Sequence, residues 1–243
     1  MNYISINLFF KKKIKSLLVK FKIHYLINPF KNIFLQLFYL GEFSEFVSKN
    51  KNLGFNDFYK SKINYEDRFQ LHQFVFEKEK LSGKIIYLEF GVADGISFKY
   101  WAEKNKNKSS RFYGFDTFTG LPENYGAFKK NHFDTGGKYP QISDKRVEFF
   151  SGLFQTSLPK FLKSHKIDPK KVIHIDSDLY SSCLYVLTSL FPYLNKGDII
   201  IFDEFGVPTF EFKAFNDFCK AYDFKFEILG AVNNYLQLAI KIK

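Results

Sequence analysis

The sequence predicts an α/β fold in which a parallel, doubly wound sheet carries helices on both faces. Three observations lead to this fold class: apolar strands alternate with helical stretches from Ser82 onward, glycines follow the first strand, and carboxylates follow several others. Strands that alternate with helices form parallel sheets through right-handed crossovers. Because ligands of such folds bind beyond the carboxyl ends of the strands, we expect the chemistry there.

The elements follow in chain order from the hydrophobic pattern. Short apolar runs bounded by turn residues are typical of buried strands, and longer amphipathic stretches are typical of helices. Strands are predicted at Ile85–Phe90, Arg111–Phe115, Arg146–Phe150, Val172–Ile175 and Asp198–Phe202, with a closing hairpin at Lys225–Leu229 and Tyr235–Ile240. Helices are predicted at Ser97–Lys104, Leu158–Ser164, Ser181–Tyr193 and Phe212–Tyr222. Residues 120–143 are glycine-rich and show no periodicity, which predicts a mobile lid.

The positive charge is concentrated at the N-terminal end. The 243 residues carry a formal net charge of +11, and residues 1–41 hold seven lysines and no acidic residue. We therefore divide the chain into a basic, largely helical extension, residues 1–80, and a catalytic domain, residues 81–243. Specific reading of bases depends on arginine side chains, and residues 1–41 have none, so no nucleic-acid partner is expected.

Residues 1–42 form a basic arm that we expect to be one or two amphipathic helices interrupted near Asn28-Pro29. Lysines among Phe, Leu and Ile are typical of helices that lie on anionic membranes, whereas a spanning helix needs a longer apolar run. Two isolated cysteines and no recognisable signal peptide indicate the cytoplasm. We expect peripheral contact of the arm with the inner face of a membrane. The alternative is that the arm packs on the domain or on a second subunit of a homo-oligomer.

The first two strands end in residues that suit a nucleoside ligand. Gly91 and Gly95 follow the first strand and allow a sharp turn and a close approach of a ligand. Their G-x-x-x-G spacing differs from the G-x-G-x-x-G that binds a pyrophosphate. Asp116 follows Gly95 by 21 residues, a distance typical of a carboxylate that accepts hydrogen bonds from ribose hydroxyls. Capping of a local turn is the alternative role of Asp116.

Two acidic clusters follow the fourth and fifth strands. Asp176 and Asp178 form the first, and Asp203 and Glu204 form the second. Neighbouring parallel strands end at the same edge, so these carboxylates face one crevice, where they must bind a cation, bind a polyol or share protons. Capping of the following helix is the alternative for Asp178. His174, inside a predicted strand, is expected to be a core residue.

Four ordered runs carry a family resemblance: LEFGVADGIS from Leu88, FYGFDTFTGLPE from Phe112, HIDSDLYSS from His174 and GDIIIFDEF from Gly197. They resemble class I S-adenosylmethionine-dependent methyltransferases and, within them, the macrocin O-methyltransferase (TylF/MycF-like) branch, which modifies sugar hydroxyls. The resemblance covers about residues 83–240. It implies a Rossmann-like, seven-stranded sheet whose last strand is antiparallel.

The resemblance also implies roles for individual residues. The candidate catalytic carboxylates are Asp176, Asp178 and Glu211. Magnesium or another divalent cation would be held by Asp176, Asp203 and Glu204, the last standing where antibiotic-pathway relatives have a second Asp. S-adenosylmethionine would be held by Glu89, Gly91, Gly95, Ser97, Asp116, Thr117, Gly152, Phe154 and Asp176.

The implied activity is O-methylation of a sugar hydroxyl in bacterial polysaccharide or natural-product biosynthesis, with a small molecule or glycan as acceptor. Two alternatives stay open. One is a nucleotide-dependent oxidoreductase on the same fold, against which the glycine spacing and the acids after the fifth strand argue. The other is a non-catalytic protein that binds S-adenosylmethionine or serves as a scaffold.

Overall fold

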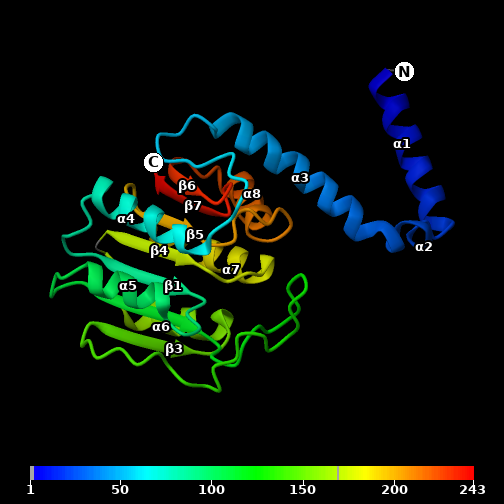
Figure 1. Ribbon diagram of the computed structural model, residues 1–243. Helices are drawn as coiled ribbons and strands as arrows, with labels where there is room; N and C mark the ends of the chain where they lie inside the picture. Colours follow the sequence, from blue (N-terminus) through cyan, green and yellow to red (C-terminus); the bar gives the residue numbers. More distant parts are fainter. Residues whose placement is uncertain (1–2, 169) are drawn as a thin grey trace. The chain divides into compact units, whose positions relative to one another are not determined.

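The chain forms two compact units in a computed structural model that describes residues 3–168 and 170–243 (Figure 1). The first unit ends at Glu42, and the second runs from Phe43 to Lys243. The second unit contains the sheet, and the first is helical.

A seven-stranded sheet forms the centre of the second unit, which confirms the predicted fold class. Its spatial order is β3-β2-β1-β4-β5-β7-β6. Strands β1 to β5 pair in parallel, and β7 is antiparallel to both β5 and β6. The chain order reverses between β1 and β4, which places the topological switch point there. The strands are β1 (Ile86–Phe90), β2 (Arg111–Asp116), β3 (Val147–Ser151), β4 (Lys171–Ile175), β5 (Ile199–Phe202), β6 (Phe226–Val232) and β7 (Gln237–Ile242).

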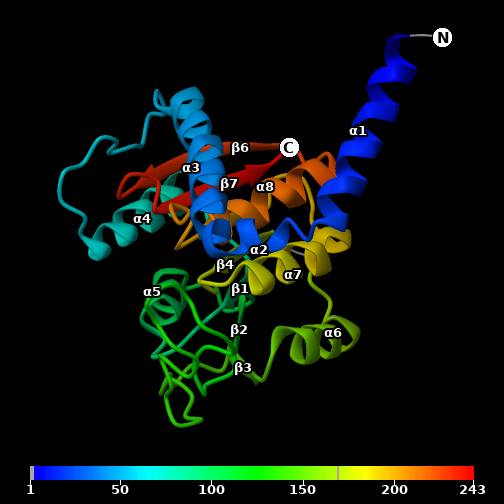
Figure 2. The ribbon, with the colours of Figure 1, turned by 90° about the vertical axis from the view of Figure 1, so that its right-hand side faces the viewer.

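Helices cover both faces of the sheet (Figure 2). On one face lie α4 (Arg68–Lys78) and α5 (Ile96–Lys104), and on the other lie α6 (Phe154–Ser164), α7 (Tyr180–Leu190) and α8 (Glu211–Tyr222). Successive side chains of a strand point to opposite faces. Tyr87 of β1 therefore stacks on Trp101 of α5, and Phe90 meets Phe154 of α6. The last contact brings the first turn of α6 onto the sheet, so this helix begins before the predicted Leu158.

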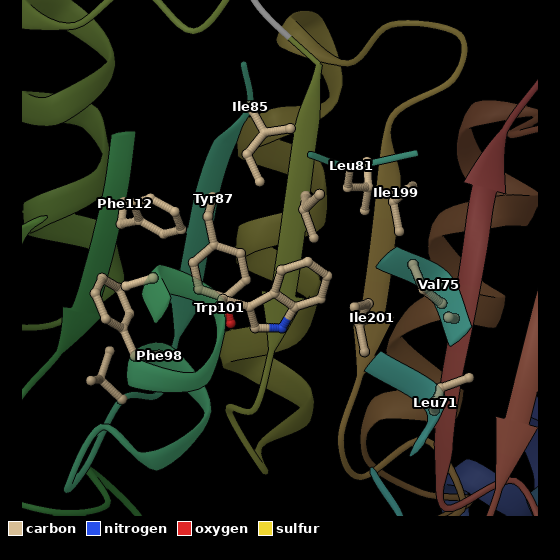
Figure 3. Close-up of a cluster of buried hydrophobic side chains, with 14 of the residues drawn as sticks. Leu71, Val75, Leu81, Ile85, Tyr87, Phe98, Trp101, Phe112, Ile199 and Ile201 are labelled. Atoms are coloured by element: carbon tan, nitrogen blue, oxygen red, sulfur yellow. The ribbon is translucent and has the colours of Figure 1, made fainter. Parts of the chain in front are cut away.

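The core between α4, α5 and the sheet combines aliphatic and aromatic side chains (Figure 3). Leu71 and Val75 of α4 are fully buried in it, and Trp101 and Phe98 of α5 fill its other end. Each such side chain contributes about 1.5 to 3 kcal/mol when it is fully buried. The predicted alternation of strands and helices follows from this need to cover both faces of an apolar sheet.

The first unit is a chain of helices with two interruptions: the predicted one near Asn28-Pro29, and a turn at residues 21–23, where Lys22 has φ +52°. The helices are α1 (Tyr3–Lys20), α2 (His24–Ile27), the 3-10 turn η1 (Asn28–Phe30) and α3 (Lys31–Asn50), the last of which continues into the second unit. Pro29 stands in η1, where its missing N–H interrupts the helical hydrogen bonds. Across residues 3–168 and 170–243, no helix has the length and apolar character needed to cross a membrane.

The division of the chain lies at residues 42/43, whereas the sequence placed it at 80/81. Residues 51–67 are held on the β6–β7 turn by side-chain hydrogen bonds. Asp57 accepts from the backbone N–H groups of Asn233 and Asn234, and Asn233 Oδ1 accepts from Asn64 N at 3.0 Å. The apolar face of α4 then joins the core. These polar contacts connect residues about 170 positions apart, so the local pattern of residues 43–80 does not reveal them.

Glu79, just after α4, is bound to a lysine of β7 and to the lysine that precedes β4. Its carboxylate accepts from Lys241 at 2.9 Å and from Lys170 at 3.2 Å. Burial opposes ionisation, but the two lysines outweigh it and lower the pKa of Glu79. A lowered pKa in the folded state means that the ionised group stabilises the fold above its unfolded pKa of about 4.3. This stabilisation is lost as the pH falls through the folded-state pKa.

We expect Glu79→Gln to lower the free energy of unfolding by about 1 to 2 kcal/mol at pH 7, because a charged hydrogen-bond acceptor is lost. The loss should shrink as the pH is lowered from 6 to 3, measured by urea denaturation. Glu103→Gln is the control, since Glu103 is exposed and lies 3.9 Å from Lys99. An effect of Glu79→Gln that is independent of pH would contradict this assignment.

Candidate active site

The loop after β1 crosses the loop after β4 at backbone distance. Gly91 has φ +93°, and a Cβ atom built there would overlap the carbonyl oxygen of Asp176. The amide of Asp176 in turn donates to Phe90 O at 2.9 Å. Gly95 has φ +75°, and its Cβ would lie 2.6 Å from Pro140. Only glycine allows both the left-handed backbone and the close crossing.

Asp116, at the end of β2, holds the glycine loop in place. Its Oδ2 accepts from Val92 N at 2.7 Å and from Ala93 N at 2.8 Å, and its Oδ1 accepts from Phe118 N at 2.8 Å. A carboxylate has about four acceptor positions, and at the fourth the Thr117 hydroxyl lies 3.4 Å from Asp116 Oδ1. The same hydroxyl donates to Gly120 O at 2.7 Å, and because it has only one proton, that position can still accept from a further hydroxyl. The structure therefore gives Asp116 the turn-organising role and keeps a ribose contact open beside it.

A cavity of about 680 Å³ opens at the carboxyl ends of β1, β2, β4 and β5. It brings together most of the residues predicted for the site. Gly152 and Glu211 are not among its lining residues. The predicted residues that line it are Glu89, Gly91, Gly95, Ser97, Asp116, Thr117, Phe154, Asp176, Asp178, Asp203 and Glu204.

One wall of the cavity is a compact acidic cluster. Single ligand atoms of His174, Asp176 and Asp203 lie within 4.8 Å of one another. His174 is fully buried. Its Nδ1 lies 3.5 Å from Glu89 Oε2, and its Nε2 lies 3.8 Å from Asp203 Oδ1. Tyr87 adds a hydrogen bond from its hydroxyl to Glu89. His174 is thus a core residue by burial, as predicted, and also part of the acidic cluster.

Arg68, at the start of α4, supplies a second positive charge to this wall. Its Nη1 donates to Asp203 Oδ2 at 3.2 Å, and the guanidinium packs near the rings of Tyr65 and Phe69. Asp203 is 1% exposed, so its charge needs a partner. Arg68 meets this need with one carboxylate oxygen and leaves the other, Oδ1, without a hydrogen-bond partner among the described residues.

Glu211 lies behind the cavity wall, between the loops after β4 and β5. It is fully buried, and its two oxygens accept from Ser177 N at 3.3 Å and from Glu204 N at 3.0 Å. A carboxylate that is buried and occupied in this way does not reach a ligand in the cavity. The predicted catalytic role of Glu211 does not fit this place, and we regard it as a positioning residue.

The crowded carboxylates resist ionisation. Burial and the charge of Asp203 raise the pKa of Asp176 well above its ordinary value. Burial, Asp203 and Asp116 raise the pKa of Asp178 to about 7, and burial raises the pKa of Glu204 to about 7. For His174, burial works against the charged ring, but Asp203 and Glu89 outweigh it and raise the pKa. The wall therefore places a charged imidazole near carboxyl groups that hold a proton more readily than usual.

The donor set suits a divalent cation at Asp176 and Asp203. Both carboxylates come from neighbouring strand ends, and Asp203 Oδ1 is buried and unpartnered among the residues described. Glu204, the third predicted ligand, lies outside the cluster, and its Oε2 accepts from the Tyr125 hydroxyl at 3.2 Å. A cation there would have to share Asp203 with Arg68.

Sequence reasoning missed several residues of the cavity. Arg68 and Tyr65 come from the segment before the regular α/β pattern, and Tyr125, Phe128 and Phe133 come from the predicted lid. The only available signal for Arg68 was that the chain has three arginines in all. Residues 117–146, which include the predicted lid of residues 120–143, contain no helix or strand and include two isolated bridges.

Known proteins match the part of the chain that forms this site. Residues 88–205 match the model of the family described as "Methyltransferase domain". Demethyldecarbamoylnovobiocin O-methyltransferase of Streptomyces niveus is 34% identical over 64 residues, which are 26% of this chain and 23% of that relative. The alignment thus spans about a quarter of the curated relative.

Solved structures share the architecture. The calicheamicin methyltransferase CalS11 has a TM-score of 0.56 at 21% identity, covering 75% of this chain and 87% of its own. The O-methyltransferase NovP has a TM-score of 0.51 at 19% identity, covering 74% of this chain and 79% of its own. The fold is that of a class I methyltransferase. The macrocin branch stays a prediction.

The crossing of the two loops makes a prediction about Gly91. Gly91→Ala should lower the free energy of unfolding by about 3 kcal/mol, because the added methyl group overlaps backbone atoms that cannot move aside. Gly197→Ala is the matched control, since Gly197 has the same φ of +93° and open space around it. The control should lower the free energy of unfolding by only about 1 to 2 kcal/mol, the cost of a left-handed backbone for a residue with a Cβ atom. Equal losses in urea denaturation would show that the crossing is not tight.

Proposed function

We propose that the protein is an S-adenosylmethionine-dependent O-methyltransferase that methylates a sugar hydroxyl in bacterial glycan or natural-product biosynthesis. One observation carries the proposal. A single cavity is bounded by the glycine loop with Asp116 on one side and by the carboxylates of Asp176, Asp178 and Asp203 on the other. The first side suits a nucleoside, and the second suits a polyol or a hydroxyl that must lose a proton.

The names of similar proteins support the type of acceptor. The curated relative is named as an O-methyltransferase of demethyldecarbamoylnovobiocin. A second CalS11 structure, with a TM-score of 0.52 at 21% identity over 75% of this chain and 88% of its own, is described as a TDP-rhamnose 3'-O-methyltransferase. We propose a sugar hydroxyl as the acceptor of this chain as well, because its cavity has the acidic wall that such an acceptor needs.

The chain's residues have two tasks in methyl transfer. S-adenosylmethionine, when bound, supplies a methyl group activated on a sulfonium sulfur. The glycine loop, Ser97, Asp116 and Thr117 would hold the donor, and the carboxylate wall would hold the acceptor, because in-line displacement depends on alignment. The acceptor hydroxyl would give its proton to Asp178 or Asp176 as its oxygen takes the methyl group from the sulfonium, with S-adenosylhomocysteine as the leaving group.

A divalent cation is part of this proposal. Asp176 and Asp203 would hold it, with Glu204 able to join only if its contact with Tyr125 is given up. When bound, a cation such as Mg²⁺ positions and acidifies neighbouring hydroxyls. Arg68 supplies a positive charge of the chain itself at the same carboxylate, Asp203. Measuring activity with the metal added and with the metal removed therefore separates the contribution of a bound cation from that of Arg68.

Calorimetric titration of S-adenosylhomocysteine tests the cofactor. We expect micromolar binding to the wild type and at least a tenfold loss in Asp116→Asn, about 1.4 kcal/mol, because the glycine loop loses a charged acceptor. Asp223→Asn is the control, since Asp223 is exposed, has a left-handed backbone that Asn tolerates, and lies far from the cavity residues in the sequence. Absence of binding to the folded wild type would favour the oxidoreductase or the scaffold alternative.

Asp203→Asn tests the acidic wall. We expect turnover to fall by about 100-fold or more, since the carboxylate that faces the acceptor is lost, while S-adenosylhomocysteine affinity changes little. The assay is transfer of a labelled methyl group to a panel of free and nucleotide-linked sugars, with Mg²⁺ or with EDTA. Full activity of Asp203→Asn would exclude the wall from the reaction. If wild-type activity survives EDTA, no divalent cation is needed, and Arg68 is the group that supplies the positive charge beside Asp203.

A further inference from the structure

The first unit lacks a core of its own. Among residues 10–42, whose side chains the structure describes, none is buried. Phe21 and Leu26 are 70% exposed, and most other large apolar side chains of the unit are exposed as well. An apolar surface of this extent on a folded chain indicates an interaction site.

Four exposed apolar side chains of α1 and the turn after it share one helix face. Phe10, Ile14, Leu17 and Phe21 follow one another at steps of four, three and four residues, the spacing of a single stripe. The N–H of Phe21 still donates to Leu17 O at 2.9 Å, so the stripe continues past the end of α1. All four side chains are exposed.

Lysines border this stripe on both sides. At 100° per residue, Lys11 and Lys15 fall on one flank and Lys13 and Lys20 on the other. All are exposed. Long lysine stems can lie along an apolar surface while the ammonium group stays at its polar edge. This is the arrangement of a helix that lies flat in a bilayer interface.

The part of α3 that belongs to the first unit repeats the apolar surface. Ile33, Leu37 and Leu40 follow at helical spacing and are exposed, as are Phe30 and Phe34. No acidic residue occurs before Glu42 in the sequence. Two copies of such a unit would bring like charges together, whereas an anionic surface complements the charge.

We propose that residues 1–42 bind to the surface of an anionic bilayer, with the apolar stripe at the acyl boundary and the lysines among the headgroups. The proposal is independent of the proposed methyl transfer. It would place the second unit beside membrane-linked acceptors if that transfer is correct. Binding by an interfacial helix requires both the apolar face and the positive charge, so each can be removed separately.

The test is co-sedimentation of the full-length protein with phosphatidylcholine vesicles, with and without phosphatidylglycerol. We expect binding only to the anionic vesicles, weakened by salt. Replacing Lys11, Lys12, Lys13 and Lys15 by Gln should reduce the affinity by more than about tenfold, because each lysine near an anionic surface contributes to binding. Ile14→Asp with Leu17→Asp should reduce it similarly through the apolar face.

The matched control replaces Lys106, Lys108, Lys145 and Lys163 by Gln, which removes the same charge from exposed positions of the second unit. It should bind vesicles as the wild type does, and thermal melting checks that all variants fold. An equal loss in the control would mean that net charge alone drives binding, which overturns the proposal. Absence of vesicle binding, with self-association that Ile14→Asp and Leu17→Asp abolish, would assign the apolar face to a second copy.

Discussion

The site depends on the burial of several carboxylates at the ends of three neighbouring strands. Glu89 of β1, Asp176 after β4 and Asp203 after β5 meet at one edge of the sheet, and Glu89 and Asp203 are each 1% exposed. Charges in such a place are costly unless they are paired and hydrogen-bonded. His174, between Glu89 and Asp203, and Arg68, beside Asp203, provide the pairing.

The need of Asp203 for a cationic partner explains why residues well before the first strand belong to the second unit. Arg68 reaches Asp203 only because α4 is fixed on the sheet by its own apolar face and because the preceding segment is held by the β6–β7 turn. Asn233 and Asn234 make that connection through Asp57 and Asn64. The C-terminal hairpin therefore supports the cavity at a distance, through a segment that has little regular structure.

Sequence patterns predicted the parts of the site that follow from strand order. Buried parallel strands read as apolar runs, and their carboxyl ends share an edge, so Asp116, Asp176 and Asp203 could be placed together without coordinates. Arg68 could not, because it comes from outside the regular alternation and its partner is 135 residues away. The boundary between the units differed for the same reason, since side-chain contacts with the distant hairpin decide it.

Glu211 shows a second limit of motif reasoning. A carboxylate after β5 suggests chemistry when only its sequence position is known. Its actual surroundings are two backbone N–H groups from different loops, and its burial removes it from the cavity. The motif identified an important residue but not whether it faces the ligand, because that depends on the path of both loops.

The loop crossing at Gly91 and the hydrogen bonds of Glu211 together explain how the proposed donor and acceptor sides can be kept in register. Gly91 fixes the glycine loop against the backbone of Asp176, so the loop at which we propose a nucleoside to bind and the first acidic loop share one junction. Glu211 then joins that acidic loop to the loop of Glu204 through Ser177. A shift of one loop would strain the other two. Because in-line transfer loses rate steeply with misalignment, this rigid connection is the property of the fold that a methyl transfer reaction needs most.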